Sequence, residues 1–501
     1  MQTANPLLQE LKKHWSFVEN QRESGEVSGS FRFFIGVSGG GDSMALLHLC
    51  MNFFPREMIR VLHFNHELRG RESDRDEELV RAICRRWGLS CRVGRGNIQA
   101  RAKETGESLE LSARRERYLF FDHCIRDCRE AEEEEIFPIL ITAHHQGDQA
   151  ETLLLRLFRG AGSRGLGGIR PFSYRQGTGG TYGVFRPLLE VAKEDLLAYD
   201  RAHRIPWRED ASNGDLLIPR NRIRHELLPL LRSSYQPSLD KTLAQTARIL
   251  AEEDAYLAEE TKQAAAAMVK DLRQIPSTEQ VESLLREAQT GNARSLLRRN
   301  ALFLSGMGIP REDFLAIPVA LQRRLLRLVF GAMQRKKEDE EDFLSFSEIE
   351  QIRRLFYQSP GKKQVLCGIM FLSDWGGVIA CPASVREGTF LQSLRSDIVA
   401  VSYEKEPDAD QLRSQRCYFY RSREKPAFRT VQPGDKMERF GGGHRALRLL
   451  FSEWKLPVPL RREWPVLADD RDILWVALLG RSPKHKLRGG GPVFSIEWRK
   501  R

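Results

Sequence analysis

The chain contains 501 residues, and its 79 Lys and Arg outnumber its 68 Asp and Glu, so the net charge is +11. Apolar residues make up 41% and charged residues 29% of the chain, which argues against a disordered protein. No apolar run approaches the ~18 residues of a membrane span, and no signal peptide is visible. The positive charge favours a polyanionic partner such as nucleic acid, although many plain enzymes are also basic.

The eight cysteines are sparse and form no C-x-x-C pair, which argues against a zinc ribbon and a thioredoxin-type site. Cys124 and Cys128 lie one helical turn apart beside His123, a spacing that two buried helix thiols explain more simply than a metal site. We therefore expect a protein of the reducing cytoplasm, with no membrane association.

In the first 232 residues, short apolar runs alternate with helix-like stretches, a pattern that predicts βαβ units around a parallel sheet. The predicted strands span 33–37, 59–64 and 138–143. The predicted helices lie within 1–25 and span 44–53, 71–87, 109–126 and 148–159. Because residues 159–183 are rich in glycine, we expect a mobile loop over the strand ends there.

From residue 237 onward the pattern becomes helical, with long helices predicted at 241–270 and 322–333. Beyond residue 361 the predicted strands span 364–372, 377–380, 427–431 and 472–479, with one helix at 444–454. The fold class we predict is therefore α/β with three domains: a parallel-sheet domain over 1–232, a mostly helical domain over 233–345 and an α+β domain over 346–501.

Ser38-Gly39-Gly40-Gly41-Asp42-Ser43 lies between a predicted strand and a predicted helix and is the strongest local signal. Its glycines let the backbone approach a ligand, while its N–H groups and the helix N-terminus attract an anion. Asp42 would repel a bare phosphate, which indicates a Mg²⁺ ion or a substrate amine beside it. A glycine-rich turn with Ser43 as the helix N-cap is the plain alternative. The strand–loop–helix context favours nucleotide binding.

The loop lacks the lysine of a Walker P-loop and resembles the pyrophosphate loop of the N-type ATP pyrophosphatases. The resemblance implies a PP-loop fold for residues 1–232 and cleavage of ATP between its α- and β-phosphates. Further motifs resemble those of one member family, the tRNA(Ile)-lysidine synthetases: His63-Phe64-Asn65-His66-Glu67-Leu68-Arg69, Ala113-Arg114-Arg115-Glu116-Arg117-Tyr118, Ala143-His144-His145-Gln146-Gly147-Asp148-Gln149-Ala150-Glu151-Thr152, the loop 159–166, the Arg186-Pro187-Leu188-Leu189 strand, and residues 207–213 with Arg220-Asn221-Arg222-Ile223-Arg224.

This family resemblance implies a role for each matched side chain. ATP would contact residues 38–43 and His63, and Mg²⁺ would bind Asp42 and Asp148. The implied catalytic residues are Asp42, Arg114, His144, Asp148 and Glu151, of which Asp148 and Glu151 would help to bind lysine. The residues implied to contact tRNA are Asn65, His66, Arg69, Arg117, Arg220, Asn221, Arg224, Arg445 and Arg448.

Two of these segments also have plain structural explanations. In residues 143–152, Asp148 can cap a helix while Glu151 reaches back, as in a capping box. In residues 220–224, the arginines can pair with acidic residues at 209 and 210 instead of RNA phosphates. Gly147 stands where the family usually has an aspartate, so one carboxylate is missing, and we expect Gly147→Asp to leave activity equal or higher.

Residues 428–436, 447–451, 457–461 and 465–467 resemble the C-terminal domain with which the longer lysidine synthetases grip the tRNA acceptor stem. The whole resemblance implies a ligase that joins free L-lysine to carbon 2 of the wobble cytidine in the CAU anticodon of tRNA(Ile), through an adenylated intermediate. A PP-loop cytidine thiolase is the nearest alternative, which the lack of paired cysteines disfavours. A non-catalytic tRNA-binding relative is another, and a homodimer stays open.

Overall fold

The computed structural model describes residues 5–23, 29–68, 70–208, 219–273, 278–334, 344–384, 398–403, 417–421, 427–439, 442–468, 473–482 and 493–498. The chain divides into two compact units, Met1–Tyr256 and Leu257–Arg501. Among the described residues, no helix combines the length and the apolar character that a membrane crossing requires.

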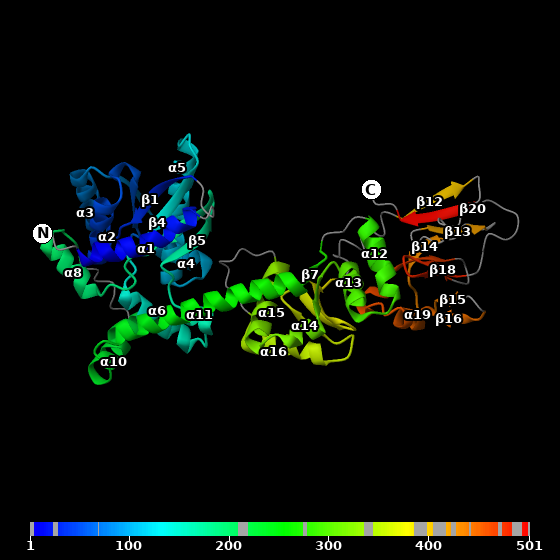
Figure 1. Ribbon diagram of the computed structural model, residues 1–501. Coiled ribbons are helices and arrows are strands. Elements are labelled where there is room, and N and C mark those ends of the chain that lie inside the picture. Colours follow the sequence, from blue (N-terminus) through cyan, green and yellow to red (C-terminus); the bar gives the residue numbers. More distant parts are fainter. Residues whose placement is uncertain are drawn as a thin grey trace. The chain divides into compact units, whose positions relative to one another are not determined.

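A six-stranded sheet in the order β3-β2-β1-β4-β6-β5 forms the centre of the N-terminal unit (Figure 1). Its strands are β1 Ser30–Gly36, β2 Ile59–Asn65, β3 Ser90–Arg95, β4 Ile136–Ile141, β5 Phe172–Gly177 and β6 Gly180–Phe185. All strands run parallel except β5, which pairs antiparallel with β6. The predicted α/β fold with a parallel sheet is therefore confirmed.

Helices cover both faces of this sheet, because neighbouring residues of a strand point to opposite faces. On β1, Phe33 and Ile35 pack into one hydrophobic cluster, while Phe34 packs into another. The helices of this unit are α1 Pro6–Glu23, α2 Gly41–Phe53, α3 Arg71–Trp87, α4 Ile98–Thr105, α5 Leu109–Ala131, α6 Gln146–Phe158, α7 Ser163–Leu166, α8 Lys193–Ala202, α9 Pro219–Arg222 and α10 Leu228–Ser234.

The glycine-rich stretch 159–183 is not the loop that we predicted. It contains α7 and most of the β5–β6 hairpin, and β6 pairs with β4. Tyr182 on β6 is fully buried and donates a hydrogen bond to Asp122 at 2.7 Å, which holds the hairpin against α5. Residues 186–189, predicted as a strand, follow the end of β6 at Phe185 and form turns.

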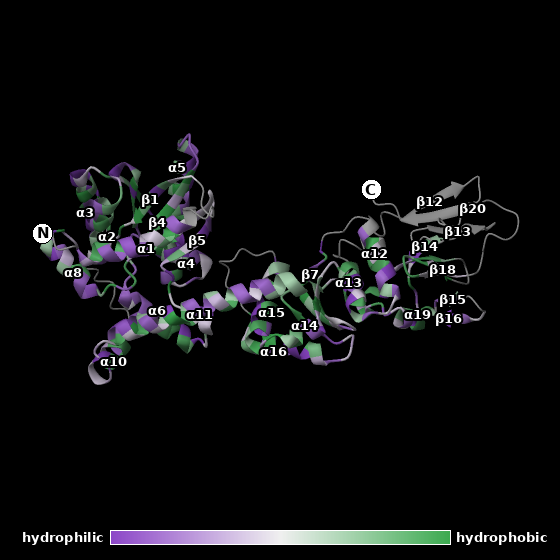
Figure 2. Ribbon diagram, in the orientation of Figure 1, coloured by the Kyte–Doolittle hydropathy of each residue, from purple (hydrophilic) through white to green (hydrophobic). Residues whose placement is uncertain are grey.

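The long helix α11, Leu239–Met268, contains the boundary between the two units. Hydrophobic and hydrophilic residues alternate along it (Figure 2), so that it buries Ala247 and Met268 and exposes Tyr256. The other helices of the middle region are α12 Thr278–Gln289, α13 Ala293–Phe303, α14 Arg311–Ala316, α15 Val319–Gln334 and α16 Phe346–Arg354. The predicted helical character of this region is confirmed.

A five-stranded sheet in the order β7-β8-β11-β10-β9 accompanies these helices. Its strands are β7 Lys270–Asp271, β8 Met307–Pro310, β9 Lys363–Leu366, β10 Ile369–Asp374 and β11 Gly377–Pro382. The single strand predicted at 364–372 is wrong, because Cys367 and Gly368 adopt positive φ angles of 45° and 77° and turn the chain between β9 and β10. Residue 345 is the predicted boundary between the second and third domains, and this sheet contains strands from before and after it. The three-domain division stays a prediction.

The last part of the chain forms three small sheets and helix α19, Leu447–Glu453. Residues 444–446, predicted as helix, form β16 and pair with β15. The remaining strands are β12 Ile398–Tyr403, β13 Cys417–Arg421, β14 Ala427–Thr430, β15 Lys436–Glu438, β16 His444–Ala446, β17 Pro465–Ala468, β18 Ile473–Val476, β19 Gly480–Arg481 and β20 Val493–Trp498. The predicted α+β character is therefore confirmed.

One hydrophobic cluster joins this last part of the chain to α13 and the five-stranded sheet. The rings of Phe303 and Trp464 lie 4.7 Å apart between centroids. Arg299 donates to the carbonyl oxygen of Trp454 at 2.7 Å, and Asn300 donates to that of Lys455 at 3.1 Å. Apolar contacts and buried hydrogen bonds thus tie the two segments together.

Candidate active site

The site lies where β1 and β4, neighbours in the sheet, end at their carboxyl edges. β1 has β2 on its other side, so the strand order changes direction at β1 and β4, and open parallel sheets bind ligands at such a point. The loop of residues 38–43 follows β1, and His144 and His145 follow β4. The sheet therefore brings together the two motifs that the sequence suggested as nucleotide and catalytic segments.

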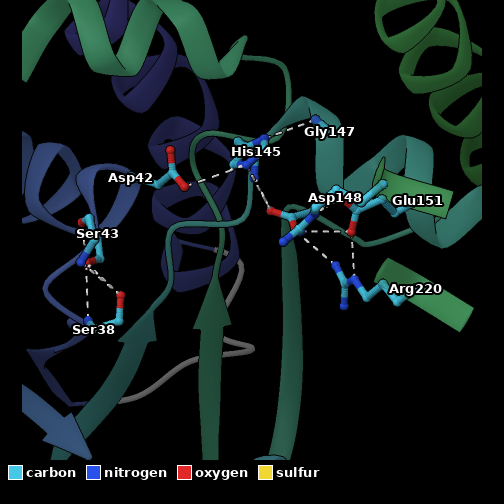
Figure 3. Close-up of polar contacts among 10 residues, drawn as sticks. Ser38, Asp42, Ser43, His145, Gly147, Asp148, Glu151 and Arg220 are labelled. Atoms are coloured by element: carbon cyan, nitrogen blue, oxygen red, sulfur yellow. Dashed lines mark hydrogen bonds and ion pairs between the residues drawn. The ribbon is translucent and has the colours of Figure 1, made fainter. Parts of the chain in front are cut away.

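The loop after β1 has the geometry of an anion-binding turn. Gly39 adopts a φ of 96°, which favours glycine. The Ser43 hydroxyl accepts a hydrogen bond from the Ser38 backbone N–H at 3.1 Å (Figure 3). The same hydroxyl donates to the Gly40 carbonyl at 2.9 Å. Gly40, not Ser43, is the N-cap of α2, so the N-cap alternative is wrong. A glycine cap offers no side-chain oxygen to the first N–H groups of the helix.

Asp42 lies in the first turn of α2 and faces the other motif. Its Oδ2 is 3.7 Å from His145 Nε2. Its Oδ1 is buried, and no group among the described residues hydrogen-bonds to it. A buried carboxylate oxygen without a partner suits a hard divalent cation, so this residue fits Mg²⁺.

The start of α6 is fixed by a capping box, although not the one that the sequence suggested. His145 is the N-cap, and its Nδ1 accepts from the Gly147 backbone N–H at 3.0 Å. Asp148 reaches back and accepts from the His145 backbone N–H at 3.0 Å. Burial by itself would raise the pKa of Asp148, but His145 and Arg220 nearby lower it overall.

Two arginines form ion pairs with the acidic residues of α6, and Figure 3 shows one of them, Arg220, beside Asp148 and Glu151. Glu151 is 2% exposed and accepts from Arg220 Nε at 2.7 Å and from Arg224 Nε at 2.5 Å. Asp148 Oδ1 accepts from Arg220 Nη2 at 2.9 Å. Arg224 lies in a π-helical turn, Ile223–Leu227, a rare feature that is frequent at functional sites. The arginines thus pair with the candidate catalytic carboxylates; the acidic partners suggested at 209 and 210 lie outside the described residues.

His144 and His63 are both held in the neutral form. His144 Nδ1 is 2.9 Å from the Thr142 hydroxyl, and burial, with nearby arginines, places the pKa of His144 well below its usual value. His63 is 3% exposed, and its Nδ1 lies 2.8 Å from the Val37 carbonyl, which it meets as a donor. Burial also lowers the pKa of His63. Each neutral imidazole can accept a proton or a hydrogen bond.

The other predicted site residues differ in how buried they are and in which groups they contact. Asn65 is 2% exposed and donates to Asp74 at 3.1 Å and to Glu77 at 3.2 Å, so its amide braces β2 against α3. Arg445 pairs with Glu453, and Arg69 lies outside the described residues. Residues placed at the protein surface or half-buried are His66, Arg114, Arg117, Asn221 and Arg448.

Asp200 on α8 is a residue that the motifs did not suggest. It is fully buried, and neither carboxylate oxygen has a hydrogen-bond partner among the described residues. A Cβ placed on Gly41 would lie 3.3 Å from its Oδ2, so the carboxyl group packs directly against the start of α2. Burial, with the nearby charge of Asp42, raises the pKa of Asp200 to about 7. No sequence motif indicates that Asp200 lies next to the loop of residues 38–43, because the two meet only through the packing of α2 against α8.

Gly147 is packed against the capping histidine. A Cβ at this position would lie 2.8 Å from His145 Cε1, closer than side chains tolerate. Any other residue must therefore move the imidazole that faces Asp42. This contact means that Gly147→Asp would disturb His145, while our expectation that activity stays equal or higher remains a prediction.

Comparison with known proteins agrees with this geometry. Residues 10–231 match the PP-loop domain family, and residues 427–498 match the TilS substrate C-terminal domain family. The chain is 30% identical over 514 residues to the tRNA(Ile)-lysidine synthase of Geobacter sulfurreducens, covering 99% of this chain and 98% of the relative. It is 30% identical over 479 residues to that of Solibacter usitatus, covering 90% and 93%.

Among solved structures, the U34-tRNA thiolase NcsA from Methanococcus maripaludis aligns with 13% identity and a TM-score of 0.36, over 50% of this chain and 81% of the thiolase. The full-length similarity to the Geobacter enzyme is the decisive finding. The chain belongs to the tRNA(Ile)-lysidine synthase family.

Proposed function

We propose that this protein is a ligase that joins the ε-amine of L-lysine to carbon 2 of the wobble cytidine in the CAU anticodon of tRNA(Ile). ATP is cleaved to AMP and pyrophosphate through an adenylated cytidine. Membership of the family supports the reaction. The single observation that carries it is the meeting of the anion-binding loop after β1 with His144, Asp148 and Glu151 after β4.

ATP belongs on the loop of residues 38–43, as in a PP-loop domain. Asp42 would hold Mg²⁺ through its unpartnered Oδ1. Asp148 fits a metal less well, because its two oxygens already accept from His145 and Arg220. When bound, Mg²⁺ stabilises negative charge on the phosphates. The neighbouring backbone N–H groups and the start of α2 orient the phosphates and add to that stabilisation.

Lysine belongs beside Asp148 and Glu151, two acidic side chains of α6. A carboxylate pair attracts an ammonium group, and in the structure two guanidinium groups hold that place. The amine must lose a proton before it attacks cytidine. We assign the handling of that proton to His144, which follows β4 just before α6. Exposed Arg114 on α5 is available to position the cytidine.

All cysteines whose side chains the structure describes are free thiols, which suits the reducing cytoplasm where tRNA is modified.

The test is incubation of the full chain with ATP, labelled lysine and a tRNA(Ile) transcript that carries the CAU anticodon. We expect lysine in the tRNA, with AMP and pyrophosphate as products. A transcript with uridine at the wobble position is the control and accepts no lysine. Failure to incorporate lysine, or release of ADP, contradicts the proposal. Iron and sulfide analysis of the purified protein tests the thiolase alternative, which the family assignment does not favour.

A further inference from the structure

Three arginines lie around the ring of Tyr118 and a fourth, Arg186, interacts electrostatically with it, and we name the four arginines the Tyr118 cluster. Arg114 and Arg117 share helix α5 with the tyrosine, Arg175 comes from β5, and Arg186 follows β6. The guanidinium carbons of Arg114, Arg117 and Arg175 lie 5.1, 6.0 and 4.4 Å from the ring centroid. Arg186 Nη1 donates to the Arg170 carbonyl at 3.0 Å, and its charge is felt at Tyr118. The electron-rich ring face attracts the three cations that lie over it.

This cluster, of three half-buried arginines and the exposed Arg114, lacks the negative charge that normally accompanies grouped arginines. Across the parts of the chain that the structure describes, no ion pair joins Arg114, Arg117 or Arg186 to a carboxylate. Arg175 has one long pair, 3.8 Å from Asp122. Burial lowers the pKa values of Arg117 and Arg186, and the charge of Arg114 lowers them further. An anion would relieve both the burial cost and the mutual repulsion.

Other arginines on the same helix are paired, so the imbalance is local. Arg115 contacts Glu107 at 3.0 Å, and Arg126 contacts Asp127 at 3.2 Å. The lack of carboxylate partners is therefore a property of the surroundings of Tyr118 and not of helix α5 as a whole.

The cluster borders the candidate active site. Thr142, which contacts His144, donates its backbone N–H to the Phe185 carbonyl at 3.1 Å, and Arg186 is the next residue. The charges of Arg186 and Arg114 contribute to the low pKa of His144. We assign the ATP phosphates to a different place, the loop after β1, where backbone N–H groups at the start of α2 can bind them. The Tyr118 cluster is therefore left for another anion.

We propose that the Tyr118 cluster binds a backbone phosphodiester of the tRNA anticodon loop beside the wobble cytidine. This inference rests on the proposed function. A cytidine that reacts at carbon 2 must leave its stack, which brings its flanking phosphates to the rim of the catalytic site. Planar guanidinium groups match the oxygen pairs of a phosphodiester and suit this task better than lysines.

The experiment compares Arg117→Gln and Arg175→Gln in the full chain with the matched control Arg115→Gln, whose guanidinium is paired with Glu107. Binding of the tRNA(Ile) transcript is measured by fluorescence anisotropy between 0.1 and 1 M salt, about the range over which one phosphate contact changes affinity five- to eightfold. Each cluster variant should weaken binding by about that factor at 0.1 M and reduce the salt slope by about 0.7 to 0.9. Arg115→Gln should change neither quantity.

Binding of a non-hydrolysable ATP analogue is measured on the same proteins and should stay unchanged. Weaker binding of the analogue with an unchanged tRNA salt slope would assign the cluster to ATP and overturn the proposal. Unchanged binding of both ligands would overturn it too. Arg117→Lys keeps the charge, so it should restore the salt slope, while thermal melting checks the fold of each variant. Failure of the proposed function is seen separately, as lack of lysine incorporation by the unmodified protein.

Discussion

Two groups of arginines flank the same candidate catalytic segment, residues 143–152, and they differ in their partners. Arg220 and Arg224 are neutralised by Asp148 and Glu151 at 2.5 to 2.9 Å. The Tyr118 cluster has one carboxylate, at 3.8 Å. In the first group, the ion pairs must break before a ligand can bind either the arginines or the carboxylates. The arginines of the second group can bind an anion directly. Net charge counts both groups alike, and only their surroundings separate them.

The largest effect is expected from Glu151→Gln, which removes the charge that neutralises the first group. Both arginines would lose their main partner next to a side chain that is 2% exposed. We expect a stability loss of about 2 kcal/mol, below the range for fully buried pairs because the arginines are partly exposed, together with loss of lysine incorporation. Urea denaturation measures the first and the labelled-lysine assay the second. Glu226→Gln, whose pair with Arg222 is 3.6 Å long and exposed, is the control and should change little.

Arg224→Gln tests whether the paired arginines compete with lysine. Since the variant frees Glu151 of one cation, L-lysine should bind the tRNA-free protein more tightly, by on the order of tenfold, within the usual range of coupling between ligands. Equilibrium dialysis with labelled lysine measures the change. Arg222→Gln, in the same segment but paired with Glu226, serves as the matched control. Equal or weaker lysine binding by Arg224→Gln would mean that Arg224 does not compete with lysine.

Gly147→Ala should have a smaller effect on the same acidic end. Its Cβ would force His145 to move, since the separation would be 2.8 Å, and the hydrogen bond from the Gly147 N–H to the ring would be lost. We expect destabilisation of about 1 kcal/mol, the size of one capping interaction. Thermal and urea unfolding measure it. Unchanged stability would show that His145 has room to rotate, and would support the expectation that Gly147→Asp leaves activity equal or higher.

The smallest effect is a change in the titration of His144. Removing the positive charge of Arg186 by Arg186→Gln should raise the pKa of His144 toward 6.5, as NMR would show. In the unchanged protein the folded-state pKa lies below the unfolded value, so stability is full above about pH 6.5 and falls as the pH falls toward the folded pKa. In the variant this fall should end at a higher pH. An unchanged His144 titration would show that the Tyr118 cluster does not act on the catalytic segment.

Much of the N-terminal unit could be predicted from the sequence, because its signals are local. The strand before Ser38 and the helix 71–87 follow from apolar runs and periodicity, and the latter agrees with α3 at both ends. The β5–β6 hairpin was missed because its glycines suggested a loop. In the fold, β6 pairs with β4, and the hairpin thereby becomes the edge of the sheet. β3 and α4 were also missed.

The candidate site was predictable as a set of residues but not as a set of contacts. Nothing in the sequence links Glu151 to Arg220, because they are 69 residues apart and meet only in the folded chain. The cap of α6 was misassigned because histidine is not among the usual N-cap residues. Asn65 was assigned to tRNA from its motif, whereas burial gives it a structural contact.

The shared core of the C-terminal unit has a consequence for how this protein can change in evolution. Phe303 packs on Trp464, and Arg299 and Asn300 have their acceptors on the segment that follows α19. A protein that lacks this last part of the chain would therefore expose an apolar, aggregation-prone surface and leave the polar groups of Arg299 and Asn300 without their acceptors. A shortened protein that stays soluble would therefore need polar residues in place of the apolar residues of α13 that this segment covers.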